Sequence, residues 1–379
     1  MEFNSFLREK LQKIKDRDLY RERFILENGV IDFSSNDYLG LRDNPVTKGK
    51  LCKKIEKIPL GSGASALISG YTQIQQELET FLSEIKETES CLVVGSGYLA
   101  NTGLLQAVIT EKDTVFSDQY NHASIIDGIR LSKAKKVIYR HNDINDLEDK
   151  LKKNNSEGFK FIVTDGVFSM EGDIAPLKEI KYLSDKYKAI LIIDDAHGTG
   201  VLGEGRGTVY HFGIKPDENL IQVGTLSKAV GSYGAFICGT EELIQFLINR
   251  MRTQIFSTAL SPVQNFISLE NLTIMMRQPE RRRKVLELSK QLYEKAKEEG
   301  IDLNYHGTPI LTLIVGEEKK ALFVRDKLLE NGIFVQAIRP PTVPEGSSRL
   351  RITVSYKHSE NDINLLVKSL KNVLESYHG

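Results

Sequence analysis

The chain has 379 residues, of which 40% are hydrophobic and 27% charged, as in ordinary folded globular proteins. Lysine plus arginine and aspartate plus glutamate number 51 each, so no global positive field would recruit nucleic acid or an anionic membrane. No apolar stretch approaches the roughly 20 residues that span a bilayer, and residues 1–23 lack the continuous apolar region of a secretory signal. We therefore expect a cytoplasmic protein with no nucleic-acid or membrane partner.

The cysteines and the one basic run indicate no special site. Cys52, Cys91 and Cys238 are widely separated and lack CxxC spacing, which favours a reduced compartment and predicts neither a disulfide framework nor a metal site. The run Arg281-Arg282-Arg283-Lys284 is local, and we interpret it as a solvated helix face.

From the N-terminus, an amphipathic helical pattern over residues 1–23 gives way to short apolar runs alternating with helical stretches. The runs are brief, β-branched and closed by Gly, Asp, Asn or Ser, and they predict buried strands at 91–94, 114–116, 136–139, 161–163, 189–193 and 220–223. Helical patterns such as 177–187 lie between several of them. This alternation predicts a largely parallel sheet covered on both faces, whose ligands bind beyond the carboxyl ends of the strands.

The C-terminal third shows a different pattern. A long helical stretch from about 241 to 300 precedes strand signals at 310–315, 334–338 and 350–354, with helices at 321–330 and 362–376. We therefore expect an α/β protein in three parts: an N-terminal arm or helix over 1–45, a large domain over 46–280, and a small α+β domain over 281–379.

Two motifs that follow predicted strands can carry chemistry. Asp194 ends one strand, and a buried acid is costly unless it meets a cation such as a pyridinium nitrogen. His197, three residues on, could then bond to the phenolic oxygen of the ring; a helix cap or a metal carboxylate is the alternative. Lys228 follows another strand among small residues, where a desolvated amine can form a Schiff base with an aldehyde cofactor, although a surface lysine has the same appearance.

Two further turns are weaker signals. The turn from Gly95 to Asn101 leads from a strand into a helix and can cradle a phosphate, or be a plain tight turn; it lacks the Gly-Lys-Ser/Thr of a P-loop and the third glycine of a dinucleotide site. His122 also follows a strand and could stack on a flat ring or exchange protons, or be an ordinary loop histidine.

Taken in order, the motifs resemble those of the α-oxoamine synthase family of fold-type I pyridoxal-phosphate enzymes, over nearly the whole chain. They are Ser35-Asn36-Asp37-Tyr38-Leu39-Gly40, Gly61-Ser62-Gly63, Asn121-His122-Ala123-Ser124, Asp165 to Asp173, Asp194 to Gly200, and Thr225-Leu226-Ser227-Lys228. The resemblance implies the fold-type I PLP-transferase architecture: a large domain with a mostly parallel sheet flanked by helices, plus a smaller C-terminal α+β domain. It implies pyridoxal 5'-phosphate as cofactor.

The resemblance also implies substrates. The segment Ala337 to Pro344, followed by Arg349-Leu350-Arg351, is similar to that of the biotin-pathway members, acyltransferases that condense L-alanine with a pimeloyl thioester and release carbon dioxide. The thiol carrier would be coenzyme A or an acyl-carrier protein. One departure, Ala64 and Ala66 where relatives have a Gly-Gly-Ser segment, restricts the backbone slightly and could reshape an acyl channel.

Residue roles carry over by position. The implied catalytic set is Lys228 (Schiff base and general base), Asp194 (pyridinium partner), His197 (ring oxygen) and His122 (stacking). The implied cofactor contacts add Gly97, Tyr98, Ser169 and Thr225, together with Ser257 and Thr258, which resemble the pair that reaches the phosphate of a neighbouring subunit and so imply a homodimer. The implied substrate contacts are Arg21, Asn36, Thr342 and Arg351, the last as the clamp for the alanine carboxylate.

Three other functions fit parts of the pattern. Glycine C-acetyltransferase, a sister enzyme, would share every cofactor residue and differ in amino acid and acyl donor. A catalytically silent homologue would serve as a binding protein, but it would need none of Lys228, Asp194, His197 and Arg351. A nucleotide-binding oxidoreductase fits the αβ alternation, yet the third glycine is missing.

Overall fold

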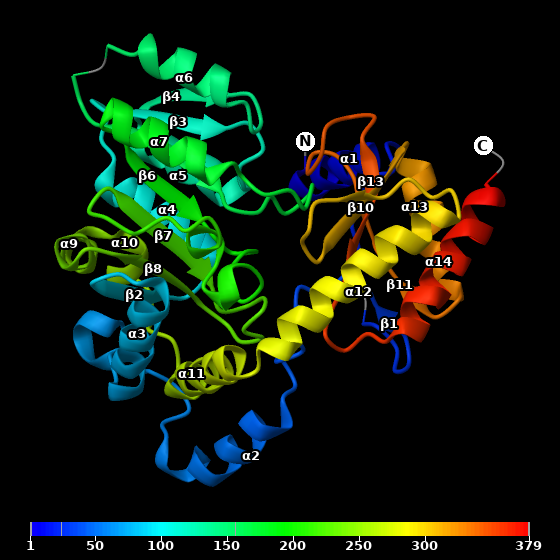
Figure 1. Ribbon diagram of the computed structural model, residues 1–379, viewed down its shortest axis with the longest axis horizontal. Helices are drawn as coiled ribbons and strands as arrows, with labels where there is room; N and C mark the ends of the chain where they lie inside the picture. Colours follow the sequence, from blue (N-terminus) through cyan, green and yellow to red (C-terminus); the bar gives the residue numbers. More distant parts are fainter. Residues whose placement is uncertain (1, 24, 156, 378–379) are drawn as a thin grey trace. The chain divides into compact units, whose positions relative to one another are not determined.

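The computed structural model describes residues 2–23, 25–155 and 157–377, which fall into two compact units (Figure 1). Unit 1 contains the described residues of Met1–Ser35, Met170–Gly172 and Lys284–Gly379; unit 2 contains Asn36–Ser169 and Asp173–Arg283. The expected division after residues 45 and 280 stays a prediction about domains. The described residues up to Ser35 do not form a separate arm but group with the C-terminal part of the chain. The reason is that Ile31 and Asp32 pair with Ile333 and Phe334.

Unit 2 is built on one mostly parallel sheet. Its strands are β2 (Ser90–Val94), β3 (Thr114–Asp118), β4 (Lys135–Tyr139), β5 (Lys160–Asp165), β6 (Ile190–Asp194), β7 (Leu220–Thr225) and β8 (Ala235–Gly239). Within the described residues they are ordered β2-β8-β7-β6-β5-β3-β4, and only the pairings of β8 with β2 and β7 are antiparallel. The sheet confirms the predicted α/β class, and β8 is a strand that the apolar runs did not predict.

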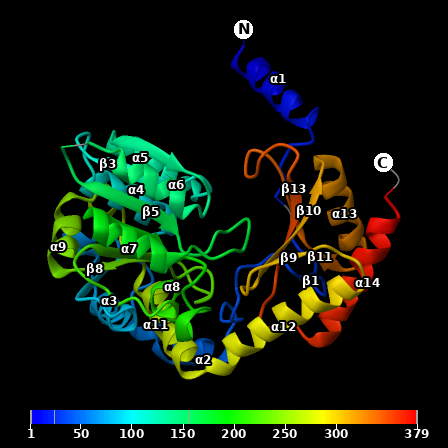
Figure 2. The ribbon, with the colours of Figure 1, turned by 45° about the horizontal axis from the view of Figure 1, so that its top comes forward.

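Helices cover both faces of this sheet, as Figures 1 and 2 show. One face packs against α4 (Gly97–Val108), α5 (Ala123–Ser132) and α9 (Glu241–Arg250), and the other against α6 (Ile144–Lys152), α7 (Leu177–Tyr187) and α8 (Thr208–His211). Ile162 and Val163 enter different cores because successive strand residues point to opposite faces. Unit 2 also contains α2 (Pro45–Lys54), α3 (Gln73–Lys86), α10 (Arg252–Ile255) and α11 (Pro262–Arg277).

Unit 1 has an antiparallel sheet in the order β12-β13-β10-β9 and a short parallel pair, β1 with β11. The strands are β1 (Ile31–Asp32), β9 (Asn304–Tyr305), β10 (Ile310–Gly316), β11 (Ile333–Phe334), β12 (Gln336–Ile338) and β13 (Ser348–Thr353). Its core contains apolar residues of these strands and of the helices α12 (Pro279–Glu298), α13 (Glu318–Glu330) and α14 (Glu360–Glu375). Figure 1 shows α13 and α14 beside β10 and β13.

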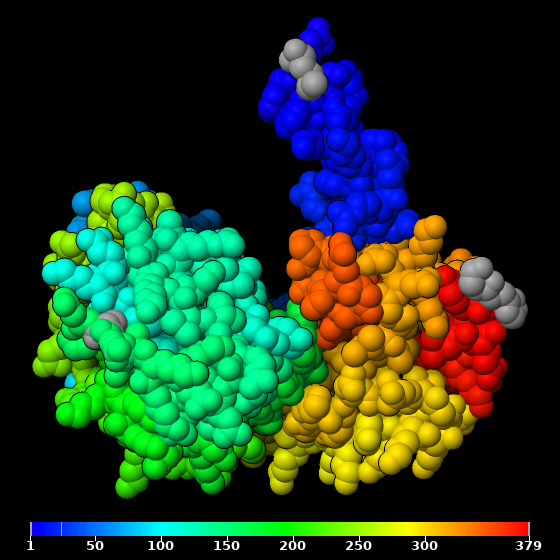
Figure 3. Space-filling view, turned by 90° about the horizontal axis from the view of Figure 1, so that it is seen from above, coloured from blue at the N-terminus to red at the C-terminus, as the bar shows by residue number. Residues whose placement is uncertain are grey.

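The N-terminal helix α1 (Phe3–Lys15) has no buried residue, and Figure 3 shows the blue N-terminal residues standing out from the orange residues of the same unit. The chain after α1 is anchored within unit 1: Arg17 pairs with Glu345 at 2.7 Å, and Arg339 donates to the carbonyl oxygen of Tyr20 at 3.2 Å. The anchoring contacts therefore lie between α1 and β1.

The basic run at the start of α12 is not a fully solvated face. Arg282 is buried and donates to the carbonyl oxygen of Met275 at 2.9 Å, while Arg281 donates to that of Leu39 at 2.9 Å. The interpretation of the run as a solvated face was therefore wrong for Arg281 and Arg282. A guanidinium can be buried when it donates hydrogen bonds to main-chain carbonyl oxygens. Within residues 2–23, 25–155 and 157–377, no helix is long and apolar enough to cross a membrane.

Candidate active site

The candidate catalytic residues of unit 2 follow the carboxyl ends of parallel strands. Asp194 is the last residue of β6, Lys228 lies in the loop after β7, and His122 lies between β3 and α5. Strands β3, β5, β6 and β7 run parallel, so their carboxyl ends meet at one edge of the sheet. We call Lys228, His197, Asp194 and His122 the Lys228 cluster.

A line of hydrogen bonds starts at the amine of Lys228. Its Nζ lies 2.7 Å from His197 Nε2, and His197 Nδ1 lies 2.6 Å from the hydroxyl oxygen of Tyr38. The Tyr38 hydroxyl also donates to Asn36 Oδ1 at 3.2 Å. The structure therefore joins Lys228 to His197, as the motif spacing suggested, and adds Tyr38 as a link to Asn36.

Asp194 is buried, and its hydrogen-bond donors are neutral. Its Oδ2 accepts from the side-chain amide of Asn101 at 2.6 Å, and its Oδ1 accepts from the backbone amide of Ala196 at 3.0 Å. Asn101 also donates to Ser124 Oγ at 2.9 Å. A buried carboxylate whose donors among the described residues are neutral is well suited to a cationic ring nitrogen, because the attraction of a cation offsets its desolvation cost.

The ring of His122 is oriented by its own helix cap. His122 caps α5, and its Nδ1 accepts from the backbone amide of Ser124 at 3.3 Å and lies 2.7 Å from Ser124 Oγ. Partial burial lowers the pKa of His122; the charge of Asp194 opposes this effect and that of Lys228 adds to it. The ring is therefore neutral at neutral pH, and with Nδ1 as acceptor its proton sits on Nε2.

A second carboxylate supports the same edge. Asp165, the last residue of β5, is buried and accepts the backbone amide of His122 at 2.8 Å. Burial raises the pKa of Asp165 well above its usual range, and the neighbouring charge of Asp194 raises it further. Asp165 thus ties the His122 loop to the sheet while keeping a tendency to stay protonated.

The turn before α4 offers free backbone amides. Ser96 caps α4 and accepts from the amide of Leu99 at 3.3 Å, and the Tyr98 side chain is directed to Asp127, which accepts its hydroxyl at 2.5 Å. Apart from its chain neighbours and the nearby backbone of α4, no heavy atom of the described residues lies within 4 Å of a Cβ built on Gly97, so the space at the helix start is open. The amides of Gly97 and Tyr98 at a twelve-residue helix suit a phosphate.

The other predicted cofactor contacts are less closely tied to the cluster. Thr225 ends β7, and its hydroxyl lies 2.7 Å from that of Ser227 in the Lys228 loop. Ser169 is half-buried at the end of a segment of unit 2. Ser257 and Thr258 follow α10, where Thr258 is exposed, and no hydrogen bond among the described residues joins them to the Lys228 cluster.

The predicted substrate contacts divide between the units. Asn36 belongs to unit 2 and meets the Lys228 cluster through Tyr38. Within unit 1, Arg21 donates to the hydroxyl of Thr342 at 3.0 Å, so these two lie together. Arg351 lies on β13, is buried, and donates to the hydroxyl of Thr353 at 2.9 Å.

The loop that carries His197 is organised around Asp195, which has a charged partner within the fold. Lys86 Nζ pairs with Asp195 Oδ2 at 2.9 Å, and both side chains are fully buried. Asp195 also accepts from Thr199 and Thr208 hydroxyls, at 3.1 and 2.7 Å. A Cβ on Gly207 would lie 1.6 Å from Asp195 Oδ2, so the loop needs glycine there. We call Lys86, Asp195, Thr199 and Thr208 the Lys86 cluster.

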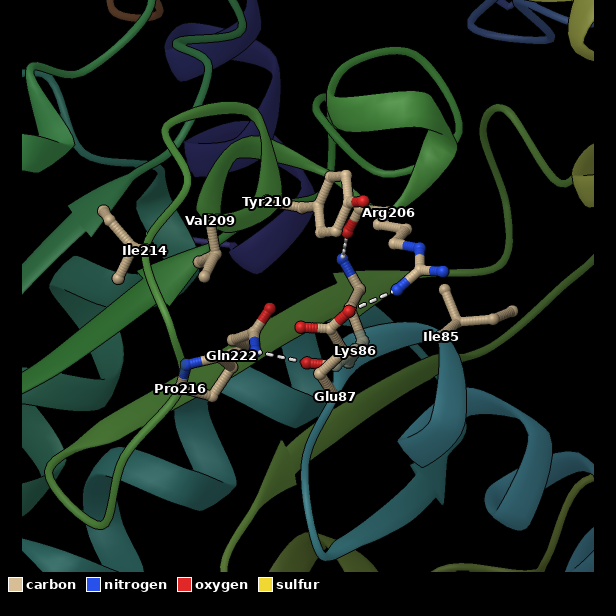
Figure 4. Close-up of a pocket in the computed structure, with 9 residues that line it drawn as sticks. All are labelled: Ile85, Lys86, Glu87, Arg206, Val209, Tyr210, Ile214, Pro216 and Gln222. Atoms are coloured by element: carbon tan, nitrogen blue, oxygen red, sulfur yellow. Dashed lines mark hydrogen bonds and ion pairs between the residues drawn. The ribbon is translucent and has the colours of Figure 1, made fainter.

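A small pocket adjoins the Lys86 cluster. Figure 4 shows Lys86 directed to the carbonyl oxygen of Arg206, 2.7 Å away, and the Gln222 side chain donating to the carbonyl oxygen of Lys86 at 3.1 Å. Its lining residues are Ile85, Lys86, Glu87, Arg206, Val209, Tyr210, Ile214, Pro216 and Gln222. None of these is a predicted site residue, so we assign this pocket to the structural support of the loop.

Four residues of the site were not predicted from sequence to take part. Tyr38 and Asp165 stood in quoted motifs without a role, and Asn101 and Ser124 join Asp194 to His122. Only long-range contacts identify them, because each is an ordinary residue type at a loop or helix position. Among the described residues, no group of His, Cys, Asp and Glu has the geometry of a metal site.

The chain resembles known proteins over nearly its whole length. Residues 28–370 match the family model for aminotransferase class I and II. A putative 8-amino-7-oxononanoate synthase of Aquifex aeolicus is 45% identical over 371 residues, covering 98% of this chain and 99% of that protein. An 8-amino-7-oxononanoate synthase of Lysinibacillus sphaericus is 45% identical over 382 residues, covering 98% of each.

Solved structures resemble the whole chain. A serine palmitoyltransferase of S. paucimobilis, solved with a bound PLP–myriocin aldimine, matches with a TM-score of 0.92 at 26% identity, covering 99% of each chain. An 8-amino-7-oxononanoate synthase of Francisella tularensis matches with a TM-score of 0.80 at 29% identity, covering 92% of this chain and 99% of that one.

Proposed function

Because the chain belongs to the 8-amino-7-oxononanoate synthase family, within the aminotransferases of class I and II, we propose that it condenses L-alanine with a pimeloyl thioester. It is a pyridoxal-phosphate-dependent acyltransferase of the fold-type I class. In the proposed reaction carbon dioxide and a free thiol carrier leave, and 8-amino-7-oxononanoate is formed for biotin biosynthesis.

The residues of the Lys228 cluster fit the cofactor. Lys228 would hold it covalently, Asp194 would face the ring nitrogen, and His197 would bond to the ring oxygen. The buried Asp194 carboxylate, which accepts from the neutral amides of Asn101 and Ala196, supports this fit because a positive ring atom would offset its charge. The open amides of Gly97 and Tyr98 would receive the phosphate, with Thr225 and Ser169 as hydroxyl contacts.

When bound, pyridoxal phosphate supplies a ring that withdraws electrons from the α-carbon of an amino acid. Lys228, released from the cofactor, would remove the α-proton of alanine as a general base. The α-carbon then attacks the thioester carbonyl carbon, the thiol leaves, the carboxylate departs as carbon dioxide, and Lys228 returns a proton to the carbon. His122, with its proton on Nε2, can donate to the oxygen that becomes negative during the attack.

The substrates would be held by the remaining predicted residues. Arg351 has the planar fork that suits the alanine carboxylate. Arg21 and Thr342, which meet at 3.0 Å, would contact the acyl substrate, and Asn36 would contact substrate from its place beside Tyr38. The acyl carrier would be coenzyme A or an acyl-carrier protein, which a comparison of the two thioesters identifies.

A second subunit completes the proposed site. Ser257 and Thr258, which among the described residues make no hydrogen bond to the Lys228 cluster, resemble the pair that reaches the partner's phosphate, so we propose a homodimer. A cytoplasmic location is in keeping with the three free cysteines.

One observation carries the proposal: the Lys228 amine, the His197 imidazole and the buried Asp194 carboxylate lie at one edge of the sheet. Tyr38 and Asn101, from two other stretches of the chain, form hydrogen bonds to His197 and Asp194. Release of free thiol and of labelled carbon dioxide, measured with carboxyl-labelled alanine and with carboxyl-labelled glycine, tests it. We expect release with pimeloyl thioesters, and much less with glycine and acetyl-CoA. Preference for glycine and acetyl-CoA would instead assign the chain to the glycine C-acetyltransferase reaction, and no release with any pair would contradict the proposal.

A further inference from the structure

We propose that Tyr38, backed by Asn36, is a positioning residue that determines which nitrogen of His197 carries the proton and thereby how readily Lys228 releases its own proton. The inference rests on the proposed function, because it concerns the amine that captures the cofactor. It assigns a role to a hydroxyl that touches neither the cofactor nor the substrates in the mechanism above.

In unit 2, hydrogen bonds join four polar side chains in a row, which we call the file: Lys228, His197, Tyr38 and Asn36. Tyr38 is fully buried and His197 nearly so, with exposures of 0% and 6%. The contacts run from Lys228 Nζ to His197 Nε2 at 2.7 Å, from His197 Nδ1 to Tyr38 Oη at 2.6 Å, and from Tyr38 Oη to Asn36 Oδ1 at 3.2 Å. A buried phenol needs a hydrogen-bond partner, and the Tyr38 hydroxyl contacts both His197 and Asn36.

Counting protons gives a first arrangement, for a charged Lys228. An ammonium has no lone pair, so His197 Nε2 must accept from it and the neutral ring must carry its proton on Nδ1. Nδ1 then donates to the Tyr38 oxygen, and the Tyr38 hydrogen goes to Asn36 Oδ1. Every contact in the file is used, and every bond points away from Lys228.

A second arrangement serves an uncharged Lys228. A neutral amine can accept from Nε2–H, so His197 presents its proton on Nε2 and receives the Tyr38 hydroxyl at Nδ1. Reversal of the Tyr38 hydroxyl is the only change at the far end of the file. The Tyr38 hydroxyl can serve both arrangements because it both donates and accepts hydrogen bonds. A phenylalanine ring has no hydroxyl and can do neither.

Tyr38 stabilises the first arrangement, with a charged Lys228, more than the second, with an uncharged Lys228. A hydrogen bond from an ammonium is charge-assisted and about twice as strong as one between neutral groups, and donation from Nδ1 to Tyr38 makes Nε2 a better acceptor. Tyr38 therefore favours the charged form of Lys228. Asp194, Asp165 and His122 also interact electrostatically with this site, and they are unchanged in the variants below.

The test follows cofactor capture by the full-length, cofactor-stripped protein as a function of pH. Capture requires the uncharged amine: Nζ attacks the aldehyde carbon, a C=N bond replaces C=O, and the oxygen leaves as water, with the ammonium proton released beforehand. We expect Tyr38→Phe to lower the pH midpoint of the capture rate by about 0.7 unit, roughly fivefold in the ionisation constant. Tyr139→Phe, which removes another buried tyrosine hydroxyl at the end of β4, is the matched control and should leave the midpoint unchanged.

Asn36→Asp gives an opposite prediction. An anionic acceptor strengthens the Tyr38 donation and with it the first arrangement, so the midpoint should rise. A direct charge effect on Lys228 would raise it too, and the double variant with Tyr38→Phe separates the two causes. If the hydroxyl transmits the effect, the rise caused by Asn36→Asp falls by at least half when Tyr38 is phenylalanine.

The outcomes are distinct. An unchanged midpoint in Tyr38→Phe, a shift shared with Tyr139→Phe, or an equal rise from Asn36→Asp in both backgrounds would overturn the role of Tyr38. If capture by the unmodified chain equals that of Lys228→Ala, the proposed anchor itself fails, whatever Tyr38 does.

Discussion

Two neighbouring aspartates of unit 2 are both buried, but the fold treats them differently. Asp195 has a buried cation, Lys86, at 2.9 Å, and hydroxyl groups complete its shell. Among the described residues, Asp194 accepts hydrogen bonds from the amides of Asn101 and Ala196. The Lys86 cluster is therefore a closed structural device, whereas in the Lys228 cluster we propose that a bound ligand neutralises the Asp194 carboxylate.

The difference shows where chemistry is to be sought in such a sheet. A buried charge that the fold neutralises stabilises one loop conformation, and its loss costs folding free energy. A buried charge that meets only neutral donors stays available to a bound cation, and its loss costs activity. Variants in the two clusters should thus separate stability from turnover.

The largest effect is expected at Lys228. Lys228→Ala should reduce turnover by at least about four orders of magnitude, or about 5.5 kcal/mol in the barrier, because it removes both anchor and base. The free energy of unfolding should change by less than about 1 kcal/mol. Carbon dioxide release and urea unfolding measure the two quantities, and near-normal turnover would remove Lys228 from its role.

Lys86→Met should show the reverse pattern. It leaves Asp195 buried without its cation, which costs about 3–5 kcal/mol of unfolding free energy. Urea unfolding measures the loss, and a second substitution, Asp195→Asn, should recover part of it because no charge then stays buried. A stability within about 1 kcal/mol of the unmodified protein would show that the pair is not a structural device.

His141 is a further charged group that residues of the fold neutralise, and its contribution to stability should depend on pH. Burial alone would lower its pKa, but hydrogen bonds to Asp118 and Asp173, at 3.0 and 2.8 Å, outweigh it and raise the pKa to about 9. The resulting stability, which solvent screening of the partly exposed ring reduces, is present below the unfolded pKa near 6.5 and is lost as pH rises through about 9. His141→Gln should flatten the stability profile over that window, and an unaltered profile would exclude this assignment.

The smallest effect separates two arginines of β13. Arg349 pairs with Glu171 at 3.1 Å, whereas Arg351 is proposed to clamp the alanine carboxylate. Arg351→Lys should raise the KM for alanine about 10- to 100-fold, because a point charge replaces a planar fork. Arg349→Lys is the matched control, and if it changed the alanine dependence as much as Arg351→Lys, the clamp would not be Arg351.

Most of the large sheet was predictable because buried parallel strands are continuous apolar runs. The run at 189–193 became β6, whose last residue is Asp194, and the helix over 177–187 is α7. Strand β8 was missed because it follows the Lys228 loop directly, without the helix that the alternating pattern leads one to expect. The single run expected at 334–338 is split between β11 and β12, which belong to different sheets.

The site was predictable to the extent that its residues follow strands. Lys228, Asp194, His197 and His122 were found in that way, and the structure brings them to one edge. Tyr38 was not assigned a role, since it lies 159 residues from His197 and only tertiary structure brings the two together. Local pattern therefore finds the groups that we propose to react, and it does not find the groups that we propose to orient them.

One measurement tests the central claim most directly: borohydride reduction of the cofactor-loaded protein, followed by peptide mass spectrometry. Reduction makes the link between cofactor and lysine permanent, so the labelled peptide identifies the anchor. The account predicts the label on Lys228 and none on Lys86, the buried lysine of the closed cluster. Label on any other lysine, or no label on protein that binds the cofactor, would contradict it.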